Sequence, residues 1–399
     1  MDRRLELHRH EFHRELNVFD YDEIELVHLE LTTRCNALCP MCRRTAFGDV
    51  APGLAMRDLS SSEIKAIFAP HFVRQLRQID LCGVHGDPVA ARSFNQALAW
   101  FRHINPRLAI EVYTNGALRP ARWWADLARD SPTLKVVFAI DGLEDTHEIY
   151  RRGASFDKVV ENARAFIDAG GRAQWDFLVF RHNEHQVDEA RRRAKEWGFT
   201  AFVPKFSGRF YRGFYEDDPQ FSDDEKAGRF PIHDRRRQIV GYLEPSSNPA
   251  YLNPVFEEMA GHLARDGSLL PHWDKADICC SAIDNHSIFV AADGAVFPCC
   301  WTYGASLYRT VYRIDDPLDN QIEDLLGRCG GRQAIDARRV AIRDICQSAF
   351  FREIARSWGR SALASGKLKI CARMCGGNLS QYSGQFSDPA IVPGRRPRA

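Results

Sequence analysis

The sequence predicts an α/β protein with a parallel sheet, followed by a smaller cysteine-rich domain. Three observations lead to this prediction. Short apolar runs alternate with longer amphipathic ones between Ile24 and Phe206, which is the pattern of βα units with helices outside a parallel sheet. Three closely spaced cysteines follow the first apolar run, and a second group of cysteines lies between Cys279 and Cys375.

Six segments have the length and apolar content of strands, and the segments between them are amphipathic. Six βα units fit an open, partial (βα)6 barrel better than a closed barrel of eight. In barrels of this kind the reactive residues lie on the loops that follow the strands. The expected strands are Ile24–Leu31, Leu76–Cys82, Leu108–Thr114, Leu134–Ile140, Ala173–Phe180 and Thr200–Lys205, and the expected helices include Ser93–His103, Ala121–Arg129, Phe156–Ala169 and Gln186–Trp197.

Changes in composition divide the chain into five expected segments. A charged N-terminal extension (1–22) precedes the barrel (23–206). Residues 207–275 break the alternating pattern with acidic clusters, the basic triplet Arg235–Arg237 and scattered Pro, Gly, Ser and Asn. We expect this segment to be a connector or cap, part helical around Pro254–Ala264. The cysteine-rich domain (276–385) and a short basic tail (386–399) complete the chain.

The overall composition excludes several classes of protein. The 399 residues carry a net charge of +1, so no overall field favours nucleic acid or an anionic membrane as a partner. No apolar run reaches the length of a membrane span, and the charged N-terminus lacks the apolar core of a signal peptide. We therefore expect a cytoplasmic protein whose 12 cysteines are reduced and available as metal ligands.

The segment LELTTRCNALCPMCRR, residues 29–44, carries the most specific signal. Cys35, Cys39 and Cys42 form a C-x3-C-x2-C run directly after the first expected strand. Thiolates spaced this closely select an iron–sulfur cluster, zinc or Cu(I). A structural zinc site takes four protein ligands, and no fourth Cys or His lies nearby in the sequence. A four-iron cluster held by three thiolates keeps one iron free to bind a small molecule.

This motif resembles the signature of the radical S-adenosylmethionine (SAM) enzymes. The resemblance implies that Cys35, Cys39 and Cys42 hold a [4Fe–4S] cluster whose open iron chelates SAM through its amino and carboxylate groups. It also implies reductive cleavage of SAM to methionine and a 5′-deoxyadenosyl radical. The electron would come from an external donor similar to flavodoxin or ferredoxin.

Short motifs at the later strand ends resemble the SAM-binding elements of the same family, in the family's order. The turn Leu81–Pro88 resembles the G-G-E-P turn, with His85 in place of the first glycine and Asp87 in place of glutamate. The segment Ala139–Gly142 resembles S-x-D-G, with alanine at the first position. The residues that the resemblance assigns to SAM binding are Gly86, Asp87, Pro88, Thr114, Asn115, Asp141 and Asn183.

The C-terminal cysteines resemble part of the SPASM or shorter twitch extension, which ligates auxiliary [4Fe–4S] clusters. Gly294-x4-Cys299 resembles the start of this extension and Cys371-x3-Cys375 its end. The rest of the SPASM motif is missing, so the resemblance implies one auxiliary cluster. Its expected ligands are one of Cys279 and Cys280, taken as Cys280, together with Cys299, Cys371 and Cys375. A zinc-ribbon-like site is the alternative, and a segment this short would need either metal to fold.

The leading functional expectation is hydrogen abstraction from a peptide, with the auxiliary cluster accepting a second electron during oxidation or crosslinking. Such a peptide would need a separate recognition protein or contacts from residues 207–275. Three alternatives stay open: a dehydrogenase of a carbohydrate-like small molecule, a redox-neutral epimerase, and a non-catalytic metal-binding scaffold. Cys300 is the candidate catalytic residue. The Gly-x4-Cys motif resembles that of anaerobic sulfatase-maturating enzymes, which carry a functional acid directly after its cysteine, and this chain has Cys300 there instead. A thiol, from Cys300 or Cys346, can donate a hydrogen atom to a carbon radical in an epimerase.

Overall fold

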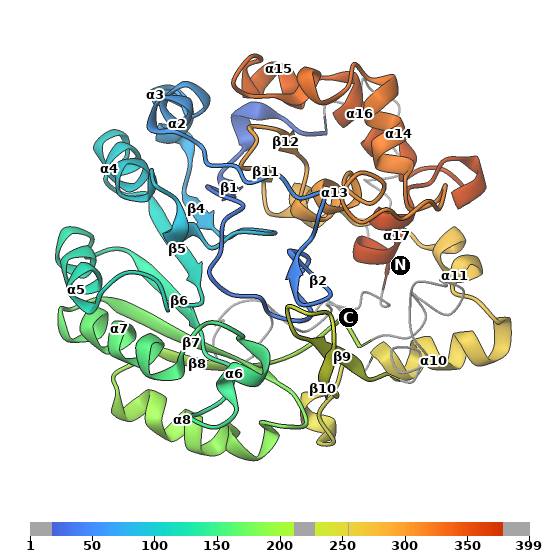
Figure 1. Cartoon of the computed structure of the whole chain (residues 1–399). Coiled ribbons are helices and arrows are strands. Elements are labelled where there is room, and N and C mark those ends of the chain that lie inside the picture. The colour runs from blue at the N-terminus through green and yellow to red at the C-terminus, as the bar shows by residue number, and fades with distance from the viewer. Residues whose placement is uncertain (1–17, 211–227, 254, 378–399) are drawn as a thin grey trace, which may run out of the picture.

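A computed structural model describes residues 18–210, 228–253 and 255–377. Its central element is an eight-stranded sheet with the order β12-β11-β1-β4-β5-β6-β7-β8. Six neighbouring strands run parallel, and Figure 1 shows helices covering the outer side of the curved sheet. These strands are β1 (Leu26–Leu29), β4 (Gln78–Leu81), β5 (Ala109–Thr114), β6 (Lys135–Ala139), β7 (Arg172–Val179) and β8 (Ala201–Phe206). The expected partial barrel is therefore confirmed.

The outer helices bury one face of each strand. Side chains at alternate positions, such as Val27, Ile79 and Val112, are fully buried, as expected for a sheet with one face under helices. The four helices expected between the strands are confirmed, with ends that differ by at most one residue. The helices of this half are α2 (Ser61–Ile67), α3 (Pro70–Gln75), α4 (Phe94–Ile104), α5 (Ala121–Asp130), α6 (His147–Tyr150), α7 (Phe156–Asp168) and α8 (Val187–Glu196).

The C-terminal part joins the same sheet, which the sequence did not predict. β11 (Ser287–Val290) pairs in parallel with β1, and β12 (Val296–Phe297) pairs antiparallel with β11. This pairing covers the free edge of β1, which would otherwise present unpaired backbone groups. The helices of this part are α12 (Ser281–Asp284), α13 (Cys300–Ala305), α14 (Gln321–Arg328), α15 (Ile342–Cys346), α16 (Ala349–Ser357) and α17 (Lys369–Cys375).

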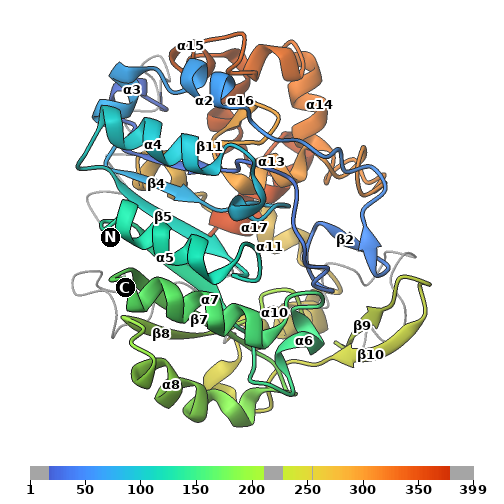
Figure 2. The same cartoon turned by 60° about the vertical axis from the view of Figure 1, so that its left-hand side comes forward.

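The connector contains a hairpin that the sequence did not predict. β9 (Phe230–His233) and β10 (Ile239–Leu243) are antiparallel, and the basic triplet lies in the turn between them. Figure 2 shows this hairpin beside β2 (Thr45–Ala46), which pairs with β3 (Asp49–Val50). The expected helix is confirmed from residue 255 onward as α10 (Val255–Asp266), and α11 (Leu270–Lys275) follows it.

Several expectations fall on residues outside the described ranges. These are most of the N-terminal extension, the acidic clusters of the connector, Pro254 and the basic tail. Within the described ranges, no helix combines the length and the apolar character needed to cross a bilayer. The short 3-10 helices are η1 (Tyr21–Glu23), η2 (Pro88–Ala90), η3 (Glu184–Gln186), η5 (Pro249–Tyr251), η6 (Arg332–Ile335) and η7 (Leu363–Ser365).

Candidate functional site

The first cysteine motif lies on the loop that follows β1, at the strand end where reactive residues of such barrels are found. Cys39 is buried, whereas Cys35 and Cys42 are half-buried. Within the loop, the Cys42 N–H donates to the Cys39 carbonyl (3.0 Å). The Leu38 N–H donates to the Arg152 carbonyl (2.9 Å). Backbone bonds therefore fix the loop both internally and against the segment after α6.

Residues from the second and third strand ends meet at Cys35. The Asn115 Nδ2 group donates to Asp87 Oδ2 (2.8 Å) and to Asn36 Oδ1 (2.9 Å), and it lies 3.5 Å from the Cys35 sulfur. Asp87 also accepts bonds from Thr114 Oγ1 (2.9 Å) and from the Asn115 N–H (2.8 Å). Three of the motifs singled out in the sequence therefore form one hydrogen-bonded group beside a candidate ligand.

The Asp87 carboxylate holds the turn together. Burial raises the pKa of this carboxyl, opposed by the hydrogen bonds that it accepts from Asn115, Thr114 and the Val89 N–H. These donors occupy most of the acceptor positions of a carboxylate. Asp87 therefore acts by positioning the turn and the adjacent cysteine loop, while Pro88 is buried at the start of η2.

Gly86 lies against the cysteine loop at a distance that excludes any side chain. A Cβ atom at Gly86 would lie 1.8 Å from the Thr32 carbonyl oxygen. A Cβ at Gly83 would lie 2.1 Å from the Gly86 carbonyl oxygen. Gly86 is therefore required where the turn approaches the segment that leads into the cysteine loop, and Gly83 is required where the turn folds back on itself.

A half-buried arginine that the sequence did not single out connects the fourth strand end to the cysteines. Arg151 forms an ion pair with Asp141 through Nε, and its Nη1 lies 3.9 Å from the Cys39 sulfur. Burial raises the pKa of the Cys39 thiol to about 11, and the Arg151 charge opposes this shift. No sequence motif marks Arg151, because it reaches the site from the loop after α6.

Asn183 has a supporting position. Its Nδ2 group donates to the carbonyls of Asp141 (3.1 Å) and Leu178 (3.0 Å), and its Oδ1 accepts the Phe180 N–H (2.7 Å). The side chain is fully buried, and its hydrogen-bonding groups are engaged with backbone. Asn183 therefore holds the end of β7 against Asp141, and its effect on any ligand is indirect.

The structure brings four C-terminal cysteines together. A pocket with about 330 Å³ of empty space, including its open mouth, is lined by these cysteines and mainly apolar neighbours. Figure 1 shows α13 close to α17; Cys299 directly precedes α13, and α17 contains Cys371 and ends at Cys375. The lining residues are Ile278, Cys280, Pro298, Cys299, Trp301, Thr302, Ile354, Trp358, Ile370, Cys371, Met374 and Cys375.

The chemistry of this pocket suits a soft, positively charged group. Burial raises the pKa of the Cys371 thiol, and Cys299, Cys280 and Cys375 raise it further. Neighbouring thiols in an apolar pocket stay uncharged unless a metal supplies positive charge. Four thiolates are the donor set of an iron–sulfur cluster or a structural zinc site. Within the residues described, no three His, Cys, Asp or Glu side chains are arranged around a single metal ion.

The remaining cysteines lie outside the pocket. Cys279 is exposed, so Cys280 is the member of the pair that faces the other thiols. Burial raises the pKa of Cys300, whose thiol has Cys299, Cys82 and Arg43 as electrostatic neighbours. Because Cys82 and Arg43 belong to the barrel, Cys300 lies on the side of the first cysteine loop. Its catalytic role stays a prediction.

Comparison with known proteins gives one group of related sequences and one of related folds. No family model matches the chain. A probable GTP 3′,8-cyclase of Halobacterium salinarum is 24% identical over 268 residues, which are 64% of this chain and 71% of the cyclase. The fold is similar to that of Streptococcus suis SuiB bound to S-adenosylmethionine, with a TM-score of 0.50, 12% identity, and coverage of 88% and 72% of the two chains.

The complex of SuiB with its precursor peptide SuiA gives the same TM-score of 0.50 over 88% of this chain and 71% of SuiB, at 12% identity. Similarity at this level of identity establishes the fold. The related sequence and the shared fold together support the assignment of the chain to the radical SAM superfamily of enzymes.

Proposed function

We propose that the chain cleaves SAM reductively at the first cysteine loop and abstracts a hydrogen atom from a bound substrate. Cys35, Cys39 and Cys42 would hold a [4Fe–4S] cluster, and an external flavodoxin- or ferredoxin-like protein would reduce it. Bound there, the cluster would supply the electron that cleaves SAM to the 5′-deoxyadenosyl radical. The chain's own contribution is to fix the ligands and exclude water from the radical.

The Asn115 side chain is the observation that carries this proposal. It contacts Asp87 of the second strand end and the Cys35 sulfur at once. Arg151 does the same for Asp141 and Cys39. Two polar side chains thus connect two later strand ends to two of the three cysteines, and an ordinary turn would not need either connection. The resemblance assigns Gly86, Thr114 and the other strand-end residues to the same cofactor.

The four-cysteine pocket supports an auxiliary [4Fe–4S] cluster held by Cys280, Cys299, Cys371 and Cys375. Held there, such a cluster would supply an acceptor for the second electron, as oxidation or crosslinking of the substrate requires. A peptide is the first candidate substrate, recognised with a separate protein or with help from the connector. The similarity of the fold to SuiB, which binds the precursor peptide SuiA, is compatible with this choice.

A polar small molecule is the second candidate, favoured by the face of the sheet that points away from the outer helices. This face carries the ion pairs Lys135–Glu111 (3.3 Å) and Lys205–Asp176 (2.5 Å). All four side chains keep some access to solvent. Charged groups on a barrel's inner face suit a substrate with hydroxyl or amino groups, such as a carbohydrate-like molecule.

SAM cleavage tests the proposal directly. Anaerobically reconstituted protein is incubated with SAM and dithionite, and 5′-deoxyadenosine is measured by chromatography. We expect the wild type to form 5′-deoxyadenosine and the Cys35→Ala/Cys39→Ala/Cys42→Ala variant to form none. Cys329→Ala is the matched control, because Cys329 lies at the end of α14, outside both sets. Equal cleavage by the triple variant and the wild type would contradict the proposal.

A further inference from the structure

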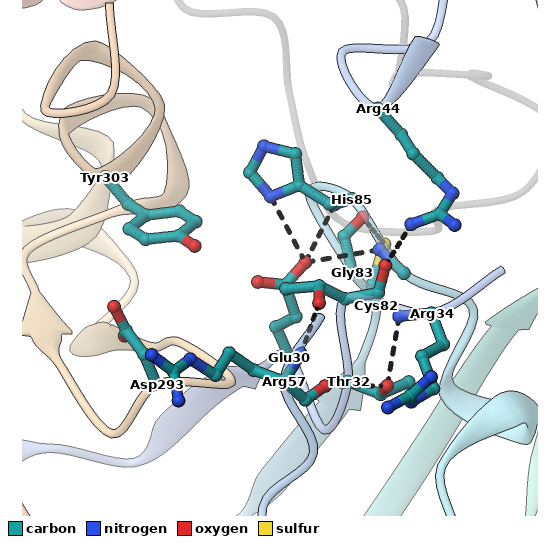
Figure 3. Close-up of polar contacts among 12 residues, drawn as sticks. Glu30, Thr32, Arg34, Arg44, Arg57, Cys82, Gly83, His85, Asp293 and Tyr303 are labelled. Atoms are coloured by element: carbon teal, nitrogen blue, oxygen red, sulfur yellow. Dashed lines mark hydrogen bonds and ion pairs between the residues drawn. The ribbon is translucent and has the colours of Figure 1, made fainter. Parts of the chain in front are cut away.

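A buried carboxylate contacts a buried imidazole of the turn Leu81–Pro88, which resembles a SAM-binding turn. Neither side chain takes part in the contacts described above. Glu30 directly follows β1, and its Oε1 accepts the N–H groups of His85 (2.7 Å) and Gly86 (3.3 Å). The His85 ring nitrogen Nδ1 lies 3.7 Å from the same oxygen. Figure 3 shows the Glu30 carboxylate pointing toward the His85 ring. Both side chains are fully buried.

The second ring nitrogen of His85 reaches the C-terminal part of the chain. Nε2 lies 2.8 Å from the Tyr312 hydroxyl, on the segment that follows α13. Glu30, His85 and Tyr312 therefore form a carboxylate–imidazole–phenol series, with a hydrogen bond between His85 and Tyr312 and a longer electrostatic contact between Glu30 and His85. His85 stands where the radical SAM turn has glycine, so this series depends on the one residue of the turn that departs most from the family pattern.

The charge on Glu30 fixes the direction of the hydrogen bonds. Burial alone would raise the pKa of Glu30, but its contacts with His85 and the Gly86 N–H outweigh burial and hold this pKa below its usual value. Glu30 is therefore ionised, and its charge favours a proton on the His85 nitrogen that faces it, Nδ1, although the 3.7 Å between the two atoms is too long for a hydrogen bond. Nε2 is then free to accept the Tyr312 hydroxyl proton. Glu30 Oε2 is buried and has no hydrogen-bond partner among the described residues.

Tyr312 lies near the first cysteine loop. Its ring is 6.3 Å from the ring of Tyr308, whose hydroxyl accepts a bond from Arg43 (3.2 Å), the residue after Cys42. The titratable and charged groups facing Tyr312 are Arg43, Cys42, Tyr308 and Arg209, and the one facing His85 from α13 is Tyr303. The half-buried phenol is thus near the region where the proposed function places the substrate.

We propose that Tyr312, His85 and Glu30 form a proton relay that removes a proton from the substrate radical during its oxidation. This inference rests on the proposed function. After hydrogen abstraction, an auxiliary iron–sulfur cluster held by the four-cysteine pocket would take up the one electron that the carbon radical loses. The neighbouring substrate O–H or N–H bond breaks as a C=O or C=N bond forms. That proton passes to Tyr312 Oη while the original Tyr312 proton passes to His85 Nε2, and the Glu30 carboxylate stabilises the imidazolium.

The tautomer of His85 tests the relay without a substrate. Nitrogen-15 NMR of histidine-labelled, anaerobically reconstituted holoenzyme distinguishes protonation at Nδ1 from protonation at Nε2, and His85→Gln identifies the signal. We expect the Nδ1-protonated form at neutral pH. Glu30→Gln should lower the Nδ1-protonated fraction of His85, because the negative charge that faces Nδ1 is lost. Tyr308→Phe is the matched control and should leave the His85 signal unchanged.

Two results would overturn the relay: an Nε2-protonated His85 in the wild type, or the same tautomer distribution in Glu30→Gln and wild type. A hydrogen bond that only ties the two segments together predicts no dependence on the Glu30 charge. If His85→Gln does not fold, Tyr312→Phe identifies the signal instead. SAM cleavage by the same wild-type preparation reports the proposed function separately. Cleavage with an Nε2-protonated His85 removes the relay alone, whereas no cleavage removes both.

Discussion

The two cysteine sites are built in opposite ways. The first has three cysteines within eight residues of one loop, and polar side chains from other strand ends support it. The second has four cysteines drawn from three separate stretches between residues 280 and 375, and its lining is mainly apolar. The first site exists because a loop is held in place, whereas the second exists only where distant segments converge.

This difference predicts which site matters for which property. A loop anchored by hydrogen bonds at β1 and β4 keeps its fold without a metal. In the second pocket, a metal would join the segments around α12, α13 and α17 through their thiols. Removing that metal would remove the link between these segments. We therefore expect the first site to control chemistry and the second to contribute most to stability.

The largest effect is expected when two ligands of the second site are removed. Cys371→Ala/Cys375→Ala should lose the auxiliary metal and destabilise the C-terminal part, because metal binding at such sites contributes on the order of 10 kcal/mol. Thermal unfolding and limited proteolysis would measure the loss. The Cys35→Ala/Cys39→Ala/Cys42→Ala variant should unfold much closer to the wild type. Equal destabilisation by the two variants would break the comparison.

The next effect concerns the polar support of the first site. Arg151→Met should cost about 3 kcal/mol or more, because it leaves the buried Asp141 carboxylate without its ion-pair partner. Asp141→Asn combined with Arg151→Met should cost less than the sum of the two single changes. Urea unfolding of the four proteins provides this cycle. Additive costs would show that the pair does not act as a unit.

The close approach of the two loops at Gly86 gives a smaller effect on stability. Gly86→Ala should cost roughly 3 kcal/mol, since its Cβ would overlap the Thr32 carbonyl. It should also lower SAM cleavage at least about tenfold. Gly327→Ala is the matched control, because no atom lies within 4 Å of the added Cβ in α14. We expect this helix position to accept alanine without loss.

The smallest effect comes from a carboxyl outside both sites. Burial raises the pKa of Asp80 from 3.8 to about 6, so the folded state binds its proton more tightly than the unfolded state. The protonated Asp80 carboxyl favours the folded state, and this contribution to the free energy of unfolding is fully present below the unfolded pKa. It is lost as the pH rises through about 6, where the folded-state carboxyl ionises. Asp80→Asn should therefore gain up to about 2 kcal/mol relative to wild type at pH 7 and less at pH 4. Thermal unfolding at the two pH values checks this, and a gain that is the same at both would contradict it.

Local sequence patterns predicted the features that are determined by residues close together in the sequence. All six barrel strands and the position of the first cysteines follow from periodicity and spacing. The pairing of β11 with β1 joins residues about 260 positions apart, and no local pattern encodes it. The same holds for Arg151, which enters the site through a loop, and for Tyr312, which reaches His85 across the two halves.

The second site shows the same boundary between local and non-local information. The sequence selected Cys299, Cys371 and Cys375 but left Cys279 and Cys280 as alternatives. The structure separates them, because Cys280 lines the pocket at the start of α12 whereas Cys279 is exposed. Adjacent residues in an extended segment point to opposite sides, so only the direction of the chain at this point distinguishes the two thiols.

The iron and sulfide content of anaerobically reconstituted protein tests the central claim, that the chain holds two different cluster sites, most directly. The measurement compares wild type, the Cys35→Ala/Cys39→Ala/Cys42→Ala variant and the Cys371→Ala/Cys375→Ala variant. We expect about eight irons per chain in the wild type and about four in each variant. SAM cleavage should be lost only when the first site is changed. About four irons in the wild type and none in the first variant, with zinc bound, would contradict the claim by making the second site structural.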